Sequence, residues 1–301
     1  MSHNLAVLQM LSGSDPLTNL AKIKQLLTTL APAKNQLVLL PENALSFSDK
    51  ESYFALAEEL GNGFYQQQLA ALAKHYQCYL LCGSFPIKSK EKAKIFTTLL
   101  VFSPQGKLLS HYHKLHLFDA LVTDKKAHYK ESDTFVPGQA LQSFDWTIDE
   151  STTVKVGLAI CYDLRFPALF QMLRAQGAQI IVLPAAFTKV TGQAHWQPLL
   201  QARAIENQCY IVAANQGGLH PSGRETYGHS MIISPWGEVL SELQFGEGII
   251  QGVFDKSLLK EVREAMPVAT HNRFIYSLKD RCKNNFEADS KVISKGNKHV
   301  F

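Results

Sequence analysis

The chain has 301 residues, of which 46% are hydrophobic and 19% charged, so it can bury a full core in one large domain or two smaller ones. Thirty Lys and Arg against 26 Asp and Glu give a net charge of +4, too weak a bias to indicate a nucleic-acid partner. No apolar run approaches the length of a membrane span, and the first residues lack the pattern of a signal peptide, so we expect no membrane association.

The first half of the chain alternates apolar runs with segments of helical periodicity. Two helices are expected within 50–76, because Gly61-Asn62-Gly63 interrupts the periodicity there. We interpret 121–129 as an exposed loop, and we expect only a short polar segment before residue 154. The other predicted elements are strands at 5–10, 35–40, 78–85, 95–103 and 108–117, and a helix at 17–30.

The second half repeats this alternation. The predicted elements are strands at 154–160, 179–187, 209–215, 227–234, 238–243 and 248–254, and helices at 162–176, 194–207 and 256–265. Many strands are apolar on both faces, which favours an α/β fold in which two sheets pack on each other beneath outer helices. No linker rich in Pro, Gly or Ser divides the chain, so we expect one domain over 1–280. A polar tail over 281–301 is predicted to be disordered or to lie on a partner.

The five cysteines are scattered along the chain and odd in number, which argues against a disulfide framework. Cys78 and Cys82 are interpreted as core residues, because the length of strand between them is too great for a disulfide. Free thiols are typical of a reducing compartment, and the cytoplasm is the simplest inference.

One cysteine stands at a chemically distinct place, at the end of an apolar strand that turns sharply into a helix. Such a turn presents its side chain at the carboxyl edge of a sheet, near the positive end of a helix dipole. Strand alternation would place Cys161 on one face with Gly157 and Ala159, whose small side chains would leave room beside the thiol. We therefore expect Cys161 to be a thiolate nucleophile, although most cysteines in such apolar surroundings are inert.

Two more polar residues lie at or near the ends of apolar strands, where α/β folds assemble their sites. Glu42 follows the second predicted strand directly, and Lys114 lies near the end of the fifth. Together with Cys161 they form a set that can carry out chemistry. Glu42 would take the thiol proton, Lys114 would lower the thiol pKa and stabilise an oxyanion, and Cys161 would attack a carbonyl or nitrile carbon. The N–H of Tyr162 would be the second oxyanion donor.

Three segments resemble, in order, the signature motifs of the carbon–nitrogen hydrolase (nitrilase) superfamily. They are Leu-Pro-Glu-Asn at 40–43, Tyr-His-Lys-Leu-His-Leu-Phe-Asp at 112–119, and Val-Gly-Leu-Ala-Ile-Cys-Tyr-Asp-Leu-Arg-Phe-Pro at 156–167. The resemblance extends from about Leu5 to Arg273. It implies a four-layer α-β-β-α sandwich of the nitrilase type, no cofactor, and pairing of chains into a homodimer or larger homo-oligomer.

The resemblance also assigns roles to single residues. It implies that Glu42 is the general base, Lys114 the cation that stabilises the transition state, and Cys161 the nucleophile. Glu131, in the segment Glu-Ser-Asp-Thr-Phe-Val-Pro-Gly, is similar to a second glutamate of the family that supports the lysine and positions substrate.

The segments 191–196, 202–210 and 227–237 are similar to the branch that contains deaminated glutathione amidase and ω-amidase. The run 223–231 is closer to the first of these, which implies hydrolysis of a small carboxylated amide through a thioester. The alternatives are ω-amidase activity on α-ketoglutaramate, and a non-catalytic or redox thiol protein on the same fold. Ala168 departs from the branch, which usually has glutamate after Arg-Phe-Pro.

The remaining polar clusters have simpler interpretations. We expect no metal site at His111, His113 and His116, because strand alternation places His116 on the other face and no Cys or carboxylate completes the set. Asp163 and Arg165 are predicted to pair with each other and brace the turn, although an anionic substrate could recruit Arg165 or the loop residue Arg224. His195-Trp196 and Trp236 are interpreted as packing or subunit contacts.

Overall fold

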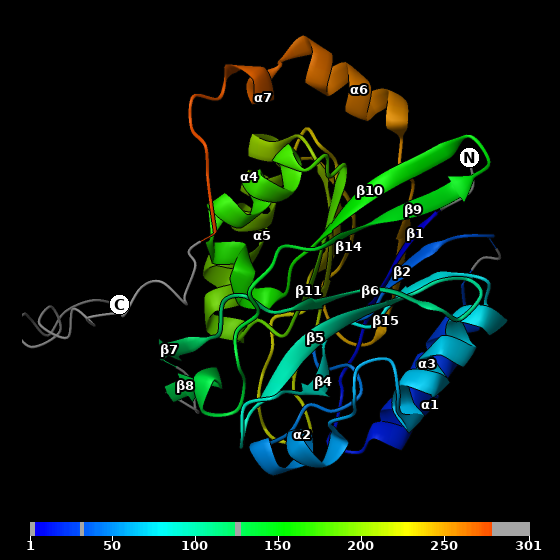
Figure 1. Cartoon of the computed structure of the whole chain (residues 1–301), viewed down its shortest axis with the longest axis vertical. Coiled ribbons are helices and arrows are strands. Elements are labelled where there is room, and N and C mark those ends of the chain that lie inside the picture. Colours follow the sequence, from blue (N-terminus) through cyan, green and yellow to red (C-terminus); the bar gives the residue numbers. More distant parts are fainter. Residues whose placement is uncertain (1–3, 31–32, 124–127, 279–301) are drawn as a thin grey trace, which may run out of the picture.

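Two β-sheets pack face to face in the computed structural model, and helices cover their outer faces (Figure 1). The structure describes residues 4–30, 33–123 and 128–278, so the predicted tail over 281–301 lies outside the described residues. Within the described part, no helix is both long and apolar enough to cross a membrane.

The first sheet has seven strands in the order β15-β1-β2-β3-β5-β4, with β6 paired to β5. The pairs β1–β2 and β2–β3 are parallel, whereas β15, β4 and β6 pair antiparallel with their neighbours. Its strands are β1 (Leu5–Gln9), β2 (Leu37–Leu39), β3 (Tyr79–Leu81), β4 (Phe85–Lys88), β5 (Ile95–Phe102), β6 (Leu108–His113) and β15 (Gly248–Gly252).

The second sheet has six strands in the order β14-β13-β12-β11-β10-β9, with β10, β11 and β12 parallel. A separate hairpin pairs β7 (Asp119–Leu121) with β8 (His128–Lys130). The strands of the second sheet are β9 (Ser143–Asp149), β10 (Thr152–Leu158), β11 (Ile180–Ala185), β12 (Tyr210–Asn215), β13 (Ser230–Ile233) and β14 (Val239–Leu243).

The helices lie mainly on the two outer faces, with α1 and α3 on one side and α4 and α5 on the other (Figure 1). Asp15 caps α1 by accepting a hydrogen bond from the Thr18 N–H, and Pro16 stands at its first position, as helix starts favour. The helices are α1 (Pro16–Leu27), α2 (Lys50–Leu56), α3 (Phe64–His75), η1 (Glu131–Asp133), η2 (Cys161–Arg165), α4 (Pro167–Ala175), α5 (Lys189–Asn207), α6 (Lys256–Ala265) and α7 (Val268–His271).

The alternation of buried residues along the strands creates the four layers. On β1, Leu5 and Val7 face the second sheet, whereas Ala6 and Leu8 pack with the buried residues of α1. The strands of the second sheet meet α4 and α5 on their other side. Strands covered on both faces must be apolar throughout, which explains the unbroken apolar runs in the sequence. The expected α-β-β-α sandwich is therefore confirmed.

Several predicted elements differ in detail. The helix expected at 162–176 is divided into η2 and α4, and the helix expected at 194–207 begins at Lys189. The strand expected at 78–85 is divided into β3 and β4, because the chain turns at Gly83, whose φ of +41° lies in the left-handed region that favours glycine. The strand expected at 108–117 ends at His113. The segment expected to be short and polar holds strand β9, and the loop expected at 121–129 includes the buried Tyr129 on β8. Residues 124–127 of that loop lie outside the described residues.

Candidate active site

Glu42 lies three residues beyond the end of β2 and is 3% exposed. Its position depends on a close approach between two turns. A Cβ at Gly83 would lie 1.8 Å from the Pro41 carbonyl oxygen, so only glycine allows the β3–β4 turn to pack against the residue before Glu42. The Glu42 Oε2 accepts a hydrogen bond of 2.9 Å from the Ala186 N–H, which follows the end of β11.

Lys114 directly follows β6 and is completely buried. Its Nζ donates to Glu42 Oε1 at 2.9 Å and to Glu131 Oε1 at 3.0 Å, so the ammonium lies between two carboxylates. These carboxylates raise the pKa of Lys114 well above its usual value, although burial alone would lower it. The lysine therefore carries a permanent positive charge inside the protein.

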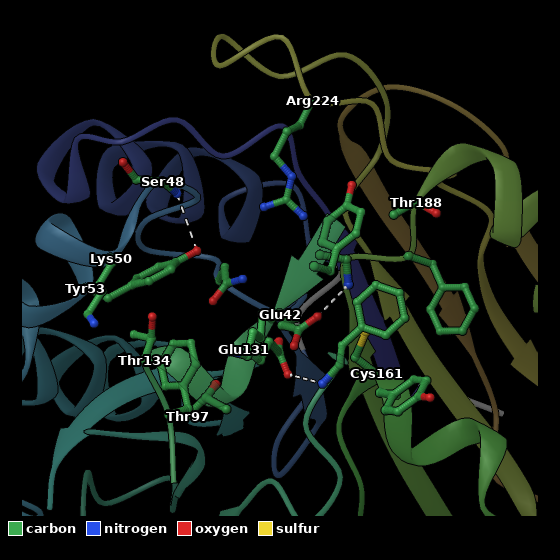
Figure 2. Close-up of a pocket in the computed structure, with 18 of the residues that line it drawn as sticks. Glu42, Ser48, Lys50, Tyr53, Thr97, Glu131, Thr134, Cys161, Thr188 and Arg224 are labelled. Carbon is green, nitrogen blue, oxygen red and sulfur yellow. Dashed lines mark hydrogen bonds between the residues drawn. The ribbon is translucent and has the colours of Figure 1, made fainter. Parts of the chain in front are cut away.

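Glu131 begins the short helix η1 and has two hydrogen-bond partners. Besides Lys114, its Oε2 accepts a bond of 2.8 Å from the Phe118 N–H, which fixes the carboxylate plane. Burial raises the pKa of Glu131 above the usual value for a glutamate, and this effect is larger than the lowering effect of the Lys114 charge. Figure 2 shows Glu42, Glu131 and Cys161 next to one another at the base of the pocket.

Cys161 is the first residue of η2 and has a φ of +47°, which is rare for any residue other than glycine. The strand has already ended at Leu158, so the predicted alternation does not apply at the cysteine. A Cβ at Gly157 would meet the Leu173 side chain of α4 at 3.0 Å, so this glycine makes room for helix packing. The expectation that Gly157 leaves space beside the thiol was wrong.

The predicted lowering effect of Lys114 on the thiol pKa is present, but other effects outweigh it. Burial and the negative charge of Glu42 raise the pKa of Cys161 well above that of a free thiol, and the lowering effect of Lys114 is smaller. The resting sulfur is therefore a neutral thiol at neutral pH, and its activation requires a proton acceptor nearby. Glu42, Glu131 and Cys161 line the pocket, and the buried ammonium of Lys114 bonds to both carboxylates. This set can support acyl transfer.

Tyr162 is the second residue of η2, and its N–H belongs to the first turn, where a helix leaves its donors without a helical partner. Its side chain lines the pocket, and its ring packs at 4.9 Å from Phe118 and 5.3 Å from Phe166. These ring contacts hold the Tyr162 side chain in place in the pocket wall.

Asp163 does not form the predicted ion pair with Arg165. Its fully buried carboxylate accepts hydrogen bonds from Tyr112, His116 and the Ile160 N–H instead. Arg165 contacts His195 at 3.3 Å and lies over the Phe187 ring. Because Arg165 faces the pocket, it is available to a ligand, as the sequence had allowed.

The pocket has a volume of about 370 Å³ and opens between the two sheets' carboxyl ends, α2 and the loop 216–229. Its wall combines aromatic and cationic side chains, including Arg165, Arg224 and Lys50. The sequence did not point to the Ala186 N–H, Tyr53 or Thr188. Ala186 follows the end of a parallel strand just as Glu42 follows β2, so the same rule would have found it.

The three histidines are engaged elsewhere. His113 stacks on Phe96 with ring centroids 4.0 Å apart, and His116 stacks on Phe166 at 3.6 Å. Among the described residues, no group of three or more His, Cys, Asp and Glu side chains is arranged to hold a metal ion. Trp196 is fully buried in the core, as predicted, whereas Trp236 is 63% exposed.

A sandwich of two sheets between helix layers, with a carboxylate–ammonium pair beside a cysteine at a strand-to-helix turn, defines a class of enzyme. The class is that of hydrolases acting on carbon–nitrogen bonds other than peptide bonds. The sequence model of the carbon-nitrogen hydrolase family matches residues 4–264, and the chain belongs to this family.

Named relatives and a solved structure cover nearly the whole chain. A deaminated glutathione amidase from Yersinia enterocolitica is 44% identical over 293 residues, 97% of this chain and 99% of that protein. Omega-amidase NIT2 of Xenopus tropicalis is 35% identical over 278 residues, 92% of this chain and 98% of that protein. The crystal structure of Saccharomyces cerevisiae Nit3, of branch 10 of the nitrilase superfamily, is 29% identical with a TM-score of 0.77. That likeness covers 90% of this chain and 96% of the yeast chain.

Proposed function

We propose that this enzyme is a thiol-dependent amidase that hydrolyses deaminated glutathione through a thioester on Cys161. The observation that carries the proposal is the burial of Lys114 between Glu42 and Glu131 at the cysteine-bearing turn. Burying an ammonium with two carboxylates costs desolvation free energy. A positive charge at this place would stabilise an oxyanion that develops on the carbonyl group attacked by the cysteine.

In the first half of the reaction, the Cys161 Sγ attacks the amide carbonyl carbon while its proton passes to the Glu42 carboxylate. The carbonyl oxygen becomes an oxyanion, which the Lys114 ammonium and the Tyr162 N–H stabilise. The intermediate then collapses, the C–N bond breaks, and Glu42 returns the proton to the leaving nitrogen. An amine departs, and the acyl group remains on sulfur as a thioester.

In the second half, water attacks the thioester carbon and Glu42 accepts one of its protons. Collapse of this intermediate breaks the C–S bond, releases a carboxylic acid and returns the proton to the sulfur. Glu131 takes no proton in this scheme. It fixes Lys114 through the bond of 3.0 Å and faces the pocket, where it positions substrate.

Two observations support a carboxylated substrate. The relatives named deaminated glutathione amidase include the Yersinia protein at 44% identity. The pocket wall also presents the guanidinium groups of Arg165 and Arg224, and guanidinium is well matched to carboxylate. Deaminated glutathione carries one carboxylate in each half of the molecule, on either side of the amide that is cleaved.

The alternative is an ω-amidase that releases ammonia from α-ketoglutaramate. The 35% identity to omega-amidase NIT2 supports this alternative. That substrate has a carboxylate only in its acyl half. The ratio of kcat/KM values for deaminated glutathione and α-ketoglutaramate ranks the two proposals, and we expect the larger value for deaminated glutathione.

The test of the thiol mechanism compares Cys161→Ala with Cys78→Ala. The first should lose all hydrolysis, and the second should retain it, because Cys78 is a buried core residue away from the pocket. Mass spectrometry of Lys114 or Glu131 variants soaked with substrate should find the acyl group on Cys161. Full hydrolysis by Cys161→Ala would refute the mechanism and favour a redox or non-catalytic thiol protein.

We further propose that residues 1–280 fold as one domain, that the chain forms a homodimer or larger homo-oligomer, and that it works in the cytoplasm. The core shared by both sheets supports a single domain. Val190 and Ile205 on α5 and the nearby Trp236 are exposed, which supports subunit contacts there. Four free cysteines among the described residues support a reducing compartment. Light scattering and cell fractionation test the last two proposals.

A further inference from the structure

Arg224 belongs to the loop 216–229 and points down into the pocket, toward the region of Glu42 (Figure 2). Within the described part of the chain, its guanidinium forms no salt bridge and no side-chain hydrogen bond. Its surroundings are aromatic instead. The guanidinium carbon lies 4.2 Å from the centroid of the Phe47 ring and 5.5 Å from that of the Tyr129 ring. Ring contacts of this kind hold the planar group in place while its N–H donors remain available to a ligand.

The Phe47 side chain, which packs against Arg224, is itself held in place. Phe47 is 1% exposed and packs against His220 with ring centroids 4.3 Å apart. The two ring nitrogens of His220 bond to the Ser12 carbonyl oxygen at 2.9 Å and to the Thr226 Oγ1 at 2.8 Å. The buried His220 therefore holds both the Phe47 ring, which contacts the Arg224 guanidinium, and the loop 216–229.

The two ends of the loop are tied to the rest of the molecule. The Thr226 N–H donates to the Gly218 carbonyl oxygen at 2.9 Å, which closes the loop on itself. Lys189 at the start of α5 pairs with Glu225 at 2.7 Å, outside the pocket wall. The place of Arg224 is thus determined by the folded chain before any ligand binds, which reduces the entropy lost on binding.

Most of the other charges of the pocket wall already have partners. Glu42 and Glu131 hold Lys114, and the Asp49 carboxylate caps α2 by accepting from the Ser52 N–H. Lys130 pairs with Asp133 at 2.9 Å, and Lys50 donates to the carbonyl oxygen of the same residue. Glu51 is exposed on α2. Arg165 and Arg224, together with Lys50, are therefore the cations of the wall without a carboxylate partner among the described residues, and of these three the two arginines carry a guanidinium group.

These two arginines come from different parts of the fold. Arg165 lies on η2 itself, four residues after Cys161, so it is placed to contact the acyl half that stays bound to the sulfur. Arg224 comes from the loop 216–229, which is far from Cys161 in the sequence. We propose that Arg224 binds a carboxylate in the leaving half of the substrate, so that the preferred leaving group is an amino acid or short peptide. This inference rests on the proposed amidase function and assigns one specificity-determining residue within it.

The test uses two substrates that differ only in this charge. They are deaminated glutathione and the same compound with the carboxylate of its leaving half converted to a carboxamide. For the unaltered enzyme we expect kcat/KM to be about 10- to 100-fold higher with the carboxylate, the range given by a charge-assisted hydrogen bond. Arg224→Gln should abolish this ratio. Arg224→Lys should retain part of it, because the charge remains and the paired donors are lost.

Lys155→Gln is the matched control, since it removes a positive charge at an exposed ion pair outside the pocket wall and away from the loop. It should leave the substrate ratio unchanged. A ratio that persists in Arg224→Gln would overturn the inference, even if overall activity falls. Hydrolysis of neither substrate by the unaltered enzyme would instead refute the proposed function itself, so the two failures are distinguishable.

Discussion

The Nδ1 of His116 lies 2.7 Å from the Oδ1 of Asp163, and a carboxylate can only accept, so the imidazole donates. The two residues come from segments that each carry a group of the proposed site. His116 stands two positions after Lys114, and Asp163 stands two positions after Cys161. The hydrogen bond therefore joins the segment that contains Lys114 to the turn that contains Cys161.

The first prediction concerns Asp163. Its Oδ2 accepts from the Tyr112 hydroxyl at 2.8 Å and from the Ile160 N–H at 2.9 Å, so all of its partners are donors. Asp163→Asn would place an amide NH₂ against such a donor, at a cost of about 1–3 kcal/mol per buried unsatisfied group. We expect kcat to fall more than KM changes, because the turn loses its fixed geometry. Urea unfolding and steady-state kinetics measure both effects.

The matched control is Asp145→Asn, which affects a surface carboxylate paired with Lys155. Its free energy of unfolding should change by less than about 1 kcal/mol, and its kcat should not change. An Asp163→Asn enzyme with unaltered kcat would show that the network is not needed to position the thiol.

The second prediction separates thiol ionisation from turnover. The negative charge of Glu42 is one cause of the raised pKa of Cys161. Glu42→Gln should therefore lower the pKa of the thiol and increase its rate of alkylation at neutral pH, while amide hydrolysis is lost with the proton acceptor. Titration of the thiolate absorbance measures the pKa, and Cys161→Ser identifies the signal. A raised pKa in Glu42→Gln would contradict the electrostatic account.

The third prediction concerns the buried ammonium. Lys114→Met leaves the carboxylates of Glu42 and Glu131 close together without a cation, and breaking a buried pair in this way costs about 3–5 kcal/mol. Protonation of one carboxylate relieves the repulsion, so the loss should be smaller near pH 5 than near pH 8. Lys155→Met, at an exposed ion pair, is the control for urea unfolding. An equal loss at both pH values would count against the charge pairing.

The fourth prediction is a pH dependence of stability. Burial lowers the pKa of His220 from 6.5 to about 4 and has the same effect on His113. In the unfolded chain the two histidines become protonated near pH 6.5, whereas in the folded protein they become protonated only near pH 4. The contribution of these two histidines to stability should thus be constant above pH 6.5 and should fall as the pH drops from 6.5 to 4. His220→Gln should reduce this slope, and an unchanged slope in calorimetry would disprove the assignment.

The sequence by itself determined the layers and the candidate groups of the site. Apolar runs such as that of β1 can be buried only between two covered faces, so their pattern specified packed sheets under helices. Glu42 and Cys161 were found because polar residues directly after buried strands meet at one sheet edge. These inferences need only the local pattern of residues.

The tertiary structure decided how the groups are used. The direction of the thiol pKa depends on burial and on Glu42, which lies 119 positions away in the sequence (161 − 42). The partner of Asp163 proved to be His116 rather than its neighbour Arg165, and Gly157 proved to accommodate Leu173. Charges and close contacts act through space, where their strength depends on distance and solvent exposure, and neither quantity can be obtained from spacing along the chain.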